Sequence, residues 1–355
     1  MNFRVGKSQA SLSKKLDRLH RSSTVVDAHS DFALHVILQR LRGRKLGLGG
    51  EHLGKLRAGG VKVEVLTVGG DFFLDGVDLR DPRNVLRVFD FIHTELNQSP
   101  NDFGLVLRGS GLDDLRREGK IALLLALEGA AAIADDFSLI RNYYRLGLRS
   151  LILTHNERNP LADGCSETPG AGLSRLGKEL IREATNLNMI LDLVHLSEAS
   201  FFDVLELTEK PPLVSHSNVR KLCDHPRNLT DRQIKAVAEC EGVIGLNFIA
   251  FLVDKDIGKA TLDRLLDHAD YIVDKVGIEH VGLGPDFADY YMNVLESWLV
   301  QHNCAPELAR YVEGVEDVSR LPKITERLCG RGYTDDQVRR ILGENFVRVY
   351  KKVLA

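Results

Sequence analysis

The chain has 355 residues, of which 44% are hydrophobic and 27% are charged, the balance of a globular protein with a large core. Its formal net charge of −3 excludes the strongly basic character that favours nucleic acid or an anionic membrane surface as a partner. Five cysteines without a Cys-x-x-Cys pair argue against a disulfide framework and against a thiolate zinc site. Because no apolar run has the length of a signal peptide or a membrane span, the expected location is the cytoplasm.

Eight short apolar runs, each bounded by turn residues, predict eight β-strands. Most of them are continuously apolar rather than alternating, which is typical of parallel strands buried on both faces. The predicted strands cover residues 24–29, 61–68, 121–127, 149–154, 189–194, 212–215, 243–248 and 280–284.

Segments with helical periodicity lie between these strands. Ser174, Thr230 and Thr261 stand at the starts of three of them, where a hydroxyl can cap a helix. Alternation of strand and helix predicts an α/β fold, a (β/α)8 TIM-type barrel. A doubly wound open sheet is the competing fold, but no Gly-rich phosphate loop follows the first strand. The clearest predicted helices cover residues 82–97, 174–187, 231–240 and 261–275.

The remaining segments predict additions to a single barrel domain that spans residues 1–355. A short helix is expected over about 8–21, and C-terminal helices are expected to pack on the barrel over about 290–355. The last of these opens with a capping box at 334–337 and is expected to continue without a break. Residues 156–173 are rich in Gly, Pro, Asn and Asp and predict a long loop over one end of the barrel.

Polar side chains with metal-binding chemistry follow several predicted strands. His29 and Asp31 are two residues apart on the first strand, so their side chains point the same way. Taken alone, a His-x-Asp pair at a strand end is ordinary turn chemistry. Active sites of such barrels lie at the carboxyl ends of the strands, however, and seven residues on one rim predict a metal site. The other five residues on this rim are Glu128, His155, His195, His216 and Asp286.

The ligand types suit two divalent metal ions. His29 and Asp31 can hold one ion, and His195 and His216 can hold a second. Glu128 has two carboxylate oxygens and could bridge both ions. Two divalent ions carry more positive charge than the carboxylates of Asp31 and Glu128 neutralise, so the centre favours a bridging hydroxide.

A hydrolytic reaction follows from this charge balance. Metal coordination can lower the pKa of water from about 15.7 to about 7, which supplies a nucleophile at neutral pH. Asp286 would then be the general base that accepts the proton of the water and returns it to the leaving group.

Eight motifs between about residue 20 and residue 350 resemble the membrane (renal) dipeptidase family of zinc peptidases, which belongs to the amidohydrolase-like metal-dependent hydrolases. They occur in the order found in the family, so the resemblance is specific. The motifs are Asp27-Ala28-His29-Ser30-Asp31, Leu127-Glu128-Gly129, Thr154-His155-Asn156, Asp192-Leu193-Val194-His195-Leu196-Ser197, Ser215-His216-Ser217, Arg227-Asn228-Leu229-Thr230-Asp231, Gly282-Leu283-Gly284-Pro285-Asp286-Phe287 and Gly343-Glu344-Asn345-Phe346.

The resemblance implies a metallo-dipeptidase with two zinc ions, although cobalt or manganese could also occupy such ligands. It places His155 near the scissile carbonyl, Asp286 as the proton shuttle and Arg227 on the terminal carboxylate of the substrate. The residues alone leave open whether Arg227 instead pairs with Asp224 or Asp231 of its own loop. The implied zinc ligands are His29, Asp31, Glu128, His195 and His216.

One departure from the family concerns the substrate site. Ile249 follows Asn247 and Phe248 where the family commonly has a tyrosine, which leaves side-chain preference open. Another barrel amidohydrolase, a lactonase or a deaminase, is the alternative enzyme, and a non-catalytic binding protein is the alternative outside enzymes. The expected partners are small dipeptides; neither nucleic acid nor a membrane is expected as a partner, and the sequence leaves homodimer formation open.

Overall fold

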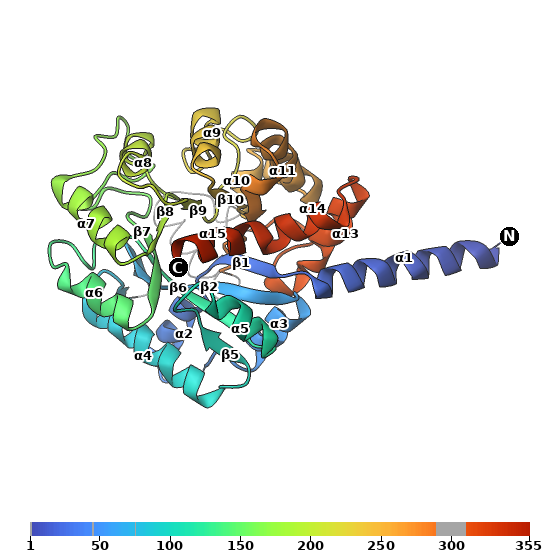
Figure 1. The fold of residues 1–355 in the computed structure, drawn as a ribbon, viewed down its shortest axis with the longest axis horizontal. Coiled ribbons are helices and arrows are strands. Elements are labelled where there is room, and N and C mark those ends of the chain that lie inside the picture. Colours follow the sequence, from blue (N-terminus) through green and yellow to red (C-terminus); the bar gives the residue numbers. More distant parts are fainter. Residues whose placement is uncertain (1, 45, 75, 289–309) are drawn as a thin grey trace.

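The structure is a computed structural model that describes residues 2–44, 46–74, 76–288 and 310–355. Eight parallel strands form a nearly closed barrel with helices around it, which confirms the predicted fold class (Figure 1). A further strand, β5 (Phe103–Leu105), pairs with β6 outside the ring. In ring order, the barrel strands are β1 (Val25–Ser30), β2 (Val61–Gly70), β6 (Ile121–Glu128), β7 (Leu148–Ile152), β8 (Ile190–Asp192), β9 (Leu213–Val214), β10 (Val243–Leu246) and β11 (Val281–Leu283).

The barrel closes at a seam between its first strand and its last strand. Ser30 and Phe287 form a parallel bridge across this seam. Nearer the amino ends of the same strands, a π-helical turn (Arg340–Glu344) lies against β1. A Cβ atom on Gly343 would lie 2.2 Å from the carbonyl oxygen of Thr24, so this close approach requires glycine.

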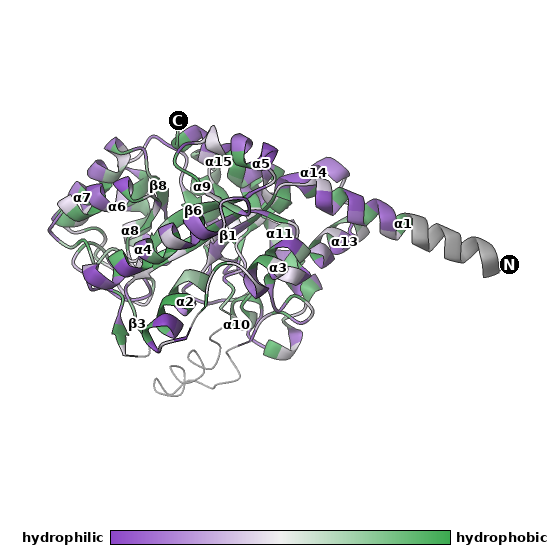
Figure 2. Cartoon of the chain, turned by 90° about the horizontal axis from the view of Figure 1, so that it is seen from below, coloured by the Kyte–Doolittle hydropathy of each residue, from purple (hydrophilic) through white to green (hydrophobic). Residues whose placement is uncertain are grey.

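Helices follow the strands and cover the outside of the barrel. Ser174, Thr230 and Thr261 cap three of them as predicted, because each hydroxyl accepts a hydrogen bond from a backbone N–H of the first turn. Hydrophilic and hydrophobic residues alternate along these helices, as expected for helices with one buried face (Figure 2). The helices around the barrel are α2 (Phe32–Leu41), α3 (Glu51–Ala58), α4 (Pro82–Gln98), α5 (Gly111–Arg117), α6 (Ser138–Arg145), α7 (Arg175–Asn186), α8 (Glu198–Leu205), α9 (Asp231–Glu239), α10 (Ala250–Val253), α11 (Leu262–Val276), α13 (Pro322–Gly330) and α14 (Asp335–Arg339).

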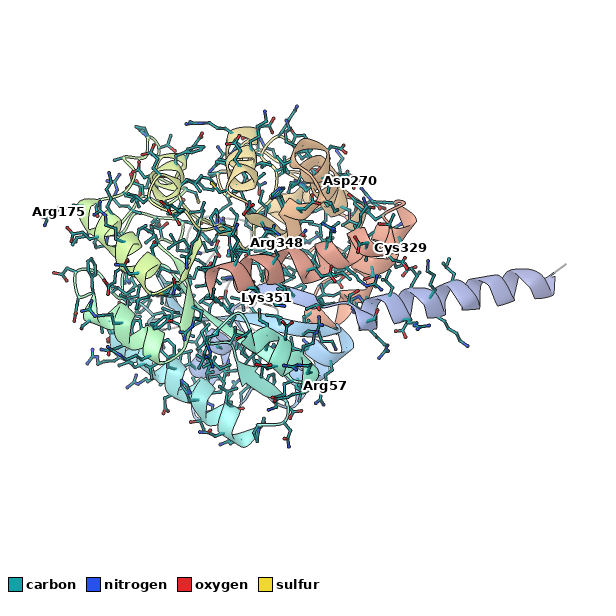
Figure 3. The ribbon with its side chains drawn as sticks, in the orientation of Figure 1. Arg57, Arg175, Asp270, Cys329, Arg348 and Lys351 are labelled. Carbon is teal, nitrogen blue, oxygen red and sulfur yellow. The ribbon has the colours of Figure 1, made fainter. Side chains whose placement is uncertain are left out.

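The amino ends of the barrel strands are sealed by α15 (Asn345–Val353). Its Phe346 and Tyr350 belong to one buried cluster with the apolar side chains of the barrel interior. On its outer side, Arg348 donates hydrogen bonds to the carbonyl oxygens of Glu241 and Glu279, and Lys351 pairs with Asp113 on α5. Figure 3 labels Arg348 and Lys351 on this helix. Because this end is filled by apolar side chains, the carboxyl ends of the strands are the open face of the barrel.

The N-terminal helix, α1 (Asn2–Ser22), is longer than the predicted segment and extends away from the barrel (Figure 1). Among the side chains that the structure describes in this helix, Leu19 is buried, whereas Leu12 is 57% exposed. His20 anchors the C-terminal end of the helix through a hydrogen bond to Thr325 on α13. None of the described helices is long and apolar enough to cross a bilayer.

Three further features differ from the sequence-based expectations. The capping box at Thr334 is confirmed, but the continuous last helix was wrong, because the π-helical turn divides it into α14 and α15. A small antiparallel hairpin, β3 (Phe73–Leu74) with β4 (Val77–Asp78), follows β2 and was not predicted, and neither was β5. Part of the predicted C-terminal helical region, residues 289–309, lies outside the described residues.

Candidate metal centre

The structure brings all seven predicted rim residues together at the open end of the barrel. They lie at or shortly after the carboxyl ends of β1, β6, β7, β8, β9 and β11. His195 and Asp286 have φ angles of 67° and 62°, in the left-handed region that non-glycine residues rarely adopt. Backbone conformations of this kind cost free energy and cluster at functional sites.

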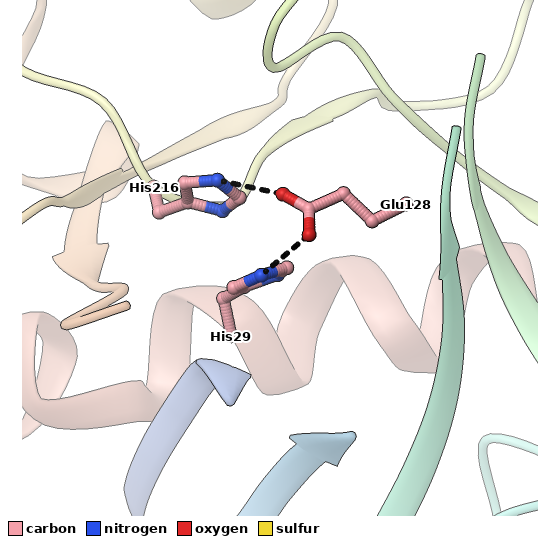
Figure 4. A group of neighbouring side chains, drawn as sticks. All are labelled: His29, Glu128 and His216. Carbon is pink, nitrogen blue, oxygen red and sulfur yellow. Dashed lines mark ion pairs between the residues drawn. The ribbon is translucent and has the colours of Figure 1, made fainter. Parts of the chain in front are cut away.

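Glu128 occupies the middle of this group. Its Oε2 lies 3.4 Å from Nε2 of His29, and its Oε1 lies 3.4 Å from Nε2 of His216 (Figure 4). The same Oε1 atom is 2.9 Å from Nε2 of His195. All four side chains are buried. The two oxygens of one carboxylate therefore face two different sets of imidazole nitrogens.

A second group of side chains, which contains two carboxylates, shares His29 with the first group. The Nε2 atom of His29 lies 3.6 Å from Oδ1 of Asp31 and 3.8 Å from Oδ1 of Asp286. These three side chains, like the group of His29, Glu128 and His216, present ligand atoms within 4.8 Å of one another. The spacing is close enough for each group to share a metal ion.

The hydrogen bonds of His195 show which of its nitrogens carries the proton. Nδ1 is 2.8 Å from the amide oxygen of Asn156, which can only accept, so Nδ1 donates and Nε2 presents a lone pair. The thiol of Cys165 donates to the same amide oxygen, which supports this orientation of the amide. The Nε2 lone pair of His195 thus faces a carboxylate oxygen at 2.9 Å and Nε2 of His216 at 3.0 Å. Two imidazole nitrogens and a carboxylate oxygen at this spacing are typical ligands of a divalent metal ion such as zinc, so these residues fit such an ion.

The electrostatics of the group also suit a cation. Burial lowers the pKa of both His195 and His216 well below the usual value, which keeps both imidazoles in the neutral form that binds metals. Burial raises the pKa of Glu128 to about 7, although the nearby His29 opposes this shift. Burial likewise raises the pKa of Asp286. A bound divalent ion would relieve the cost of holding these carboxylates ionised away from water.

His155 lies at the side of the group. Its ring centroid is 4.4 Å from that of His195, and the ring of Phe72 packs edge-on against it at 4.9 Å. Burial, with a contribution from Arg227, lowers the pKa of His155 to about 3. His155 is therefore neutral and can donate or accept a hydrogen bond at the edge of the metal centre.

Arg227 is a nearly buried cation beside the centre. It is 8% exposed, and its Nη2 donates a long hydrogen bond of 3.4 Å to the carbonyl oxygen of His216. Among the described residues, no carboxylate forms an ion pair with it, because Asp224 and Asp231 each pair with a lysine instead. This excludes the loop pairing that the sequence left open. The guanidinium therefore retains donors for an anionic group of a ligand.

Two asparagines that orient the predicted residues were not identified from the sequence. Asn156 holds Nδ1 of His195, and Asn247 donates a hydrogen bond of 2.9 Å to Oδ2 of Asp286. Asn156 belongs to a quoted motif and Asn247 lies in the predicted strand 243–248, but an amide side chain does not by itself indicate a metal or catalytic site. Only their positions in the fold show what they contact.

The chain is similar to known proteins over most of its length. The family model described as membrane dipeptidase (peptidase family M19) matches residues 13–355. The dipeptidase tcpJ of Claviceps purpurea is 30% identical over 287 residues, which is 80% of this chain and 63% of that protein. The dipeptidase verJ of Clonostachys rogersoniana is 31% identical over 285 residues, covering 80% of this chain and 68% of that protein. The chain thus spans a little under two thirds of the length of the first of these curated relatives.

Solved structures share the fold. The probable dipeptidase PvdM from Pseudomonas aeruginosa has a TM-score of 0.81 and 22% identity, covering 97% of this chain and 99% of that one. A metallopeptidase from Rhodobacter sphaeroides, solved with a phosphinate mimic of the dipeptide L-Ala-D-Ala, has a TM-score of 0.79 and 23% identity. This match covers 93% of this chain and 99% of the other. At these identities the structural likeness is a likeness of fold.

Proposed function

The chain belongs to the membrane dipeptidase family, and from this premise we propose that it hydrolyses the amide bond of free dipeptides at a centre of two zinc ions. The observation that carries the proposal is the position of Glu128, whose two oxygens face different sets of donors. His29 and Asp31 would hold one ion, and His195 and His216 the other, with Glu128 shared between them.

The bound ions would polarise the scissile carbonyl and lower the pKa of the attacking water. Asp286 would accept the proton of that water and return it to the leaving amine, a role supported by its position beside His29 and by its hydrogen bond from Asn247. His155 is neutral at the edge of the centre, so its ring N–H can stabilise the oxygen on which negative charge develops.

Arg227 would hold the C-terminal carboxylate of the substrate. A planar guanidinium forms two parallel hydrogen bonds with a carboxylate, which fixes both the orientation and the length of the ligand. The dipeptide mimic bound to the Rhodobacter sphaeroides metallopeptidase supports a dipeptide as the substrate class. A single domain, a cytoplasmic location and a possible homodimer stay predictions from the sequence.

Metal analysis followed by a dipeptide panel tests the proposal. Purified protein should contain about two divalent ions per chain, lose activity on chelation and regain it with zinc. Glu128→Gln should reduce metal content, because it removes the charge shared by both sets of ligands. Absence of metal together with no hydrolysis after zinc addition would reject the proposal. Turnover of lactones without turnover of dipeptides would favour the alternative amidohydrolase.

A further inference from the structure

Tyr311 lies on a segment that is fixed against the end of β10. Ala250 donates a backbone hydrogen bond of 2.9 Å to Arg310, and Val312 donates one of 2.9 Å to Phe248. These two bonds flank Tyr311 on either side, in an antiparallel arrangement. The backbone of Tyr311 is therefore held independently of its side chain.

The phenol of Tyr311 reaches across to the neighbouring strand end, after β11. Its hydroxyl donates a hydrogen bond of 2.8 Å to the carbonyl oxygen of Asp286 and accepts one from the N–H of Ala288. Its ring packs edge-on against Phe287, with 5.2 Å between the ring centroids. Because Tyr311 and Ala288 are each only 8% exposed, this contact is largely shielded from water. One hydroxyl thus joins both sides of the turn that carries Asp286.

That turn needs support, because the φ angle of Asp286 is 62° and a non-glycine residue reaches this region only at a cost. The side chain of Asp286 is held separately by Asn247, whose Nδ2 donates to Oδ2 at 2.9 Å. The amide of Asn247 is oriented in turn by the N–H of Ile249, which donates to its Oδ1 at 2.8 Å. Asn247 therefore fixes the carboxylate, whereas Tyr311 fixes the backbone from which that carboxylate projects.

We propose that Tyr311 is a positioning residue for Asp286. This rests on the proposed function, in which Asp286 transfers the proton of the attacking water. The hydroxyl does not contact the reacting atoms; it keeps the turn in the conformation that directs the carboxylate toward His29 and the metal site. A small displacement of a general base lowers the rate of proton transfer far more than it weakens substrate binding.

The test is Tyr311→Phe, measured alone and in an Asp286→Asn background. The single variant should lower kcat about tenfold, since each of two lost hydrogen bonds corresponds to roughly a 2- to 12-fold change. KM and metal content should stay unchanged. In the Asp286→Asn background, the same substitution should cause no further loss of kcat, because the group that it positions has already been removed. Tyr333→Phe is the matched control, since Tyr333 also donates a hydroxyl hydrogen bond, to Asp270 on the outer face of α11.

If Tyr311→Phe lowers kcat by the same factor in the Asp286→Asn background as in the unmodified enzyme, Tyr311 has a general structural role and the proposal is overturned. Loss of metal from the Tyr311→Phe variant would overturn it in the same way. If the unmodified enzyme does not hydrolyse dipeptides, the proposed function fails, and crystal structures decide the inference instead. Tyr311→Phe should then move Asp286 out of its left-handed conformation. An unchanged φ angle at Asp286 would reject the positioning role, whatever the substrate is.

Discussion

Replacing Arg227 by methionine should abolish the preference of the enzyme for a free C-terminal carboxylate. Methionine keeps an unbranched apolar stem at this nearly buried site, so the change removes charge with little loss of packing. In the unmodified protein no described carboxylate pairs with the guanidinium, so a substrate carboxylate would be its anionic partner. Charge-assisted hydrogen bonds are worth about 1.5–3 kcal/mol, which corresponds to a loss of about 10- to 150-fold in kcat/KM.

The assay compares dipeptides with their C-terminal amides in the unmodified enzyme and in Arg227→Met. The kcat/KM of the unmodified enzyme should be about 10- to 150-fold higher for the dipeptide than for its C-terminal amide. Arg227→Met should hydrolyse both substrates at about the rate at which the unmodified enzyme hydrolyses the amide. Arg232→Met is the matched control, because Arg232 is an exposed arginine on the surface of α9. Metal content should be the same in all three proteins.

Equal turnover of dipeptides and amides by the unmodified enzyme would refute this reasoning. The guanidinium would then have a different ligand, and the lactonase or deaminase alternatives would gain support. Loss of metal from Arg227→Met would also contradict it, because the proposed role of Arg227 lies in substrate binding and not in the metal centre.

Four further variants test other parts of the site and the fold. Asp286→Asn should lower kcat by roughly 10²-fold or more while the metal content, measured by atomic absorption, stays the same. Asn156→Leu leaves Nδ1 of His195 without its acceptor and should weaken metal affinity by about 10- to 100-fold in chelator competition, whereas Asn156→Asp keeps an acceptor and should bind more tightly than the leucine variant. Burial lowers the pKa of His268 from 6.5 to about 4, so the folded state binds fewer protons than the unfolded chain and stability falls as the pH falls from about 6.5 toward 4. The free energy of unfolding in urea should decrease by roughly 1–2 kcal/mol between pH 7 and pH 5 from this histidine, and His268→Gln should reduce that dependence.

The barrel could be predicted from the sequence because its strands are buried on both faces. All eight predicted strands are present, and a run such as 121–127 is apolar on both faces, which makes it recognisable in the sequence. The rule that active sites lie at the carboxyl ends of strands then brought together residues as far apart as His29 and Asp286. Their convergence needed no knowledge of loops, because parallel strands place their carboxyl ends at the same edge.

The unpredicted features depend on contacts that no local pattern records. The strands β3 and β5 lie outside the alternation of barrel strand and helix, and their two or three residues give no periodic signal by themselves. The last helix appeared continuous because apolar spacing continues through Gly343, whereas its break reflects the close approach of that residue to β1. Tyr311 reaches Asp286 from a segment 25 residues later in the chain, and only the fold shows that the segment returns to this point.

The seam of the barrel ties folding to activity. The bridge between Ser30 and Phe287 joins the first strand to the last, and its two residues are the immediate neighbours of His29 and Asp286. Pairing of the seven other strand junctions could be complete while this pair is still apart. During refolding, the far-UV circular dichroism signal should therefore recover before catalytic activity does. The rate at which activity returns in zinc-supplemented buffer would then report the rate at which β1 and β11 come together.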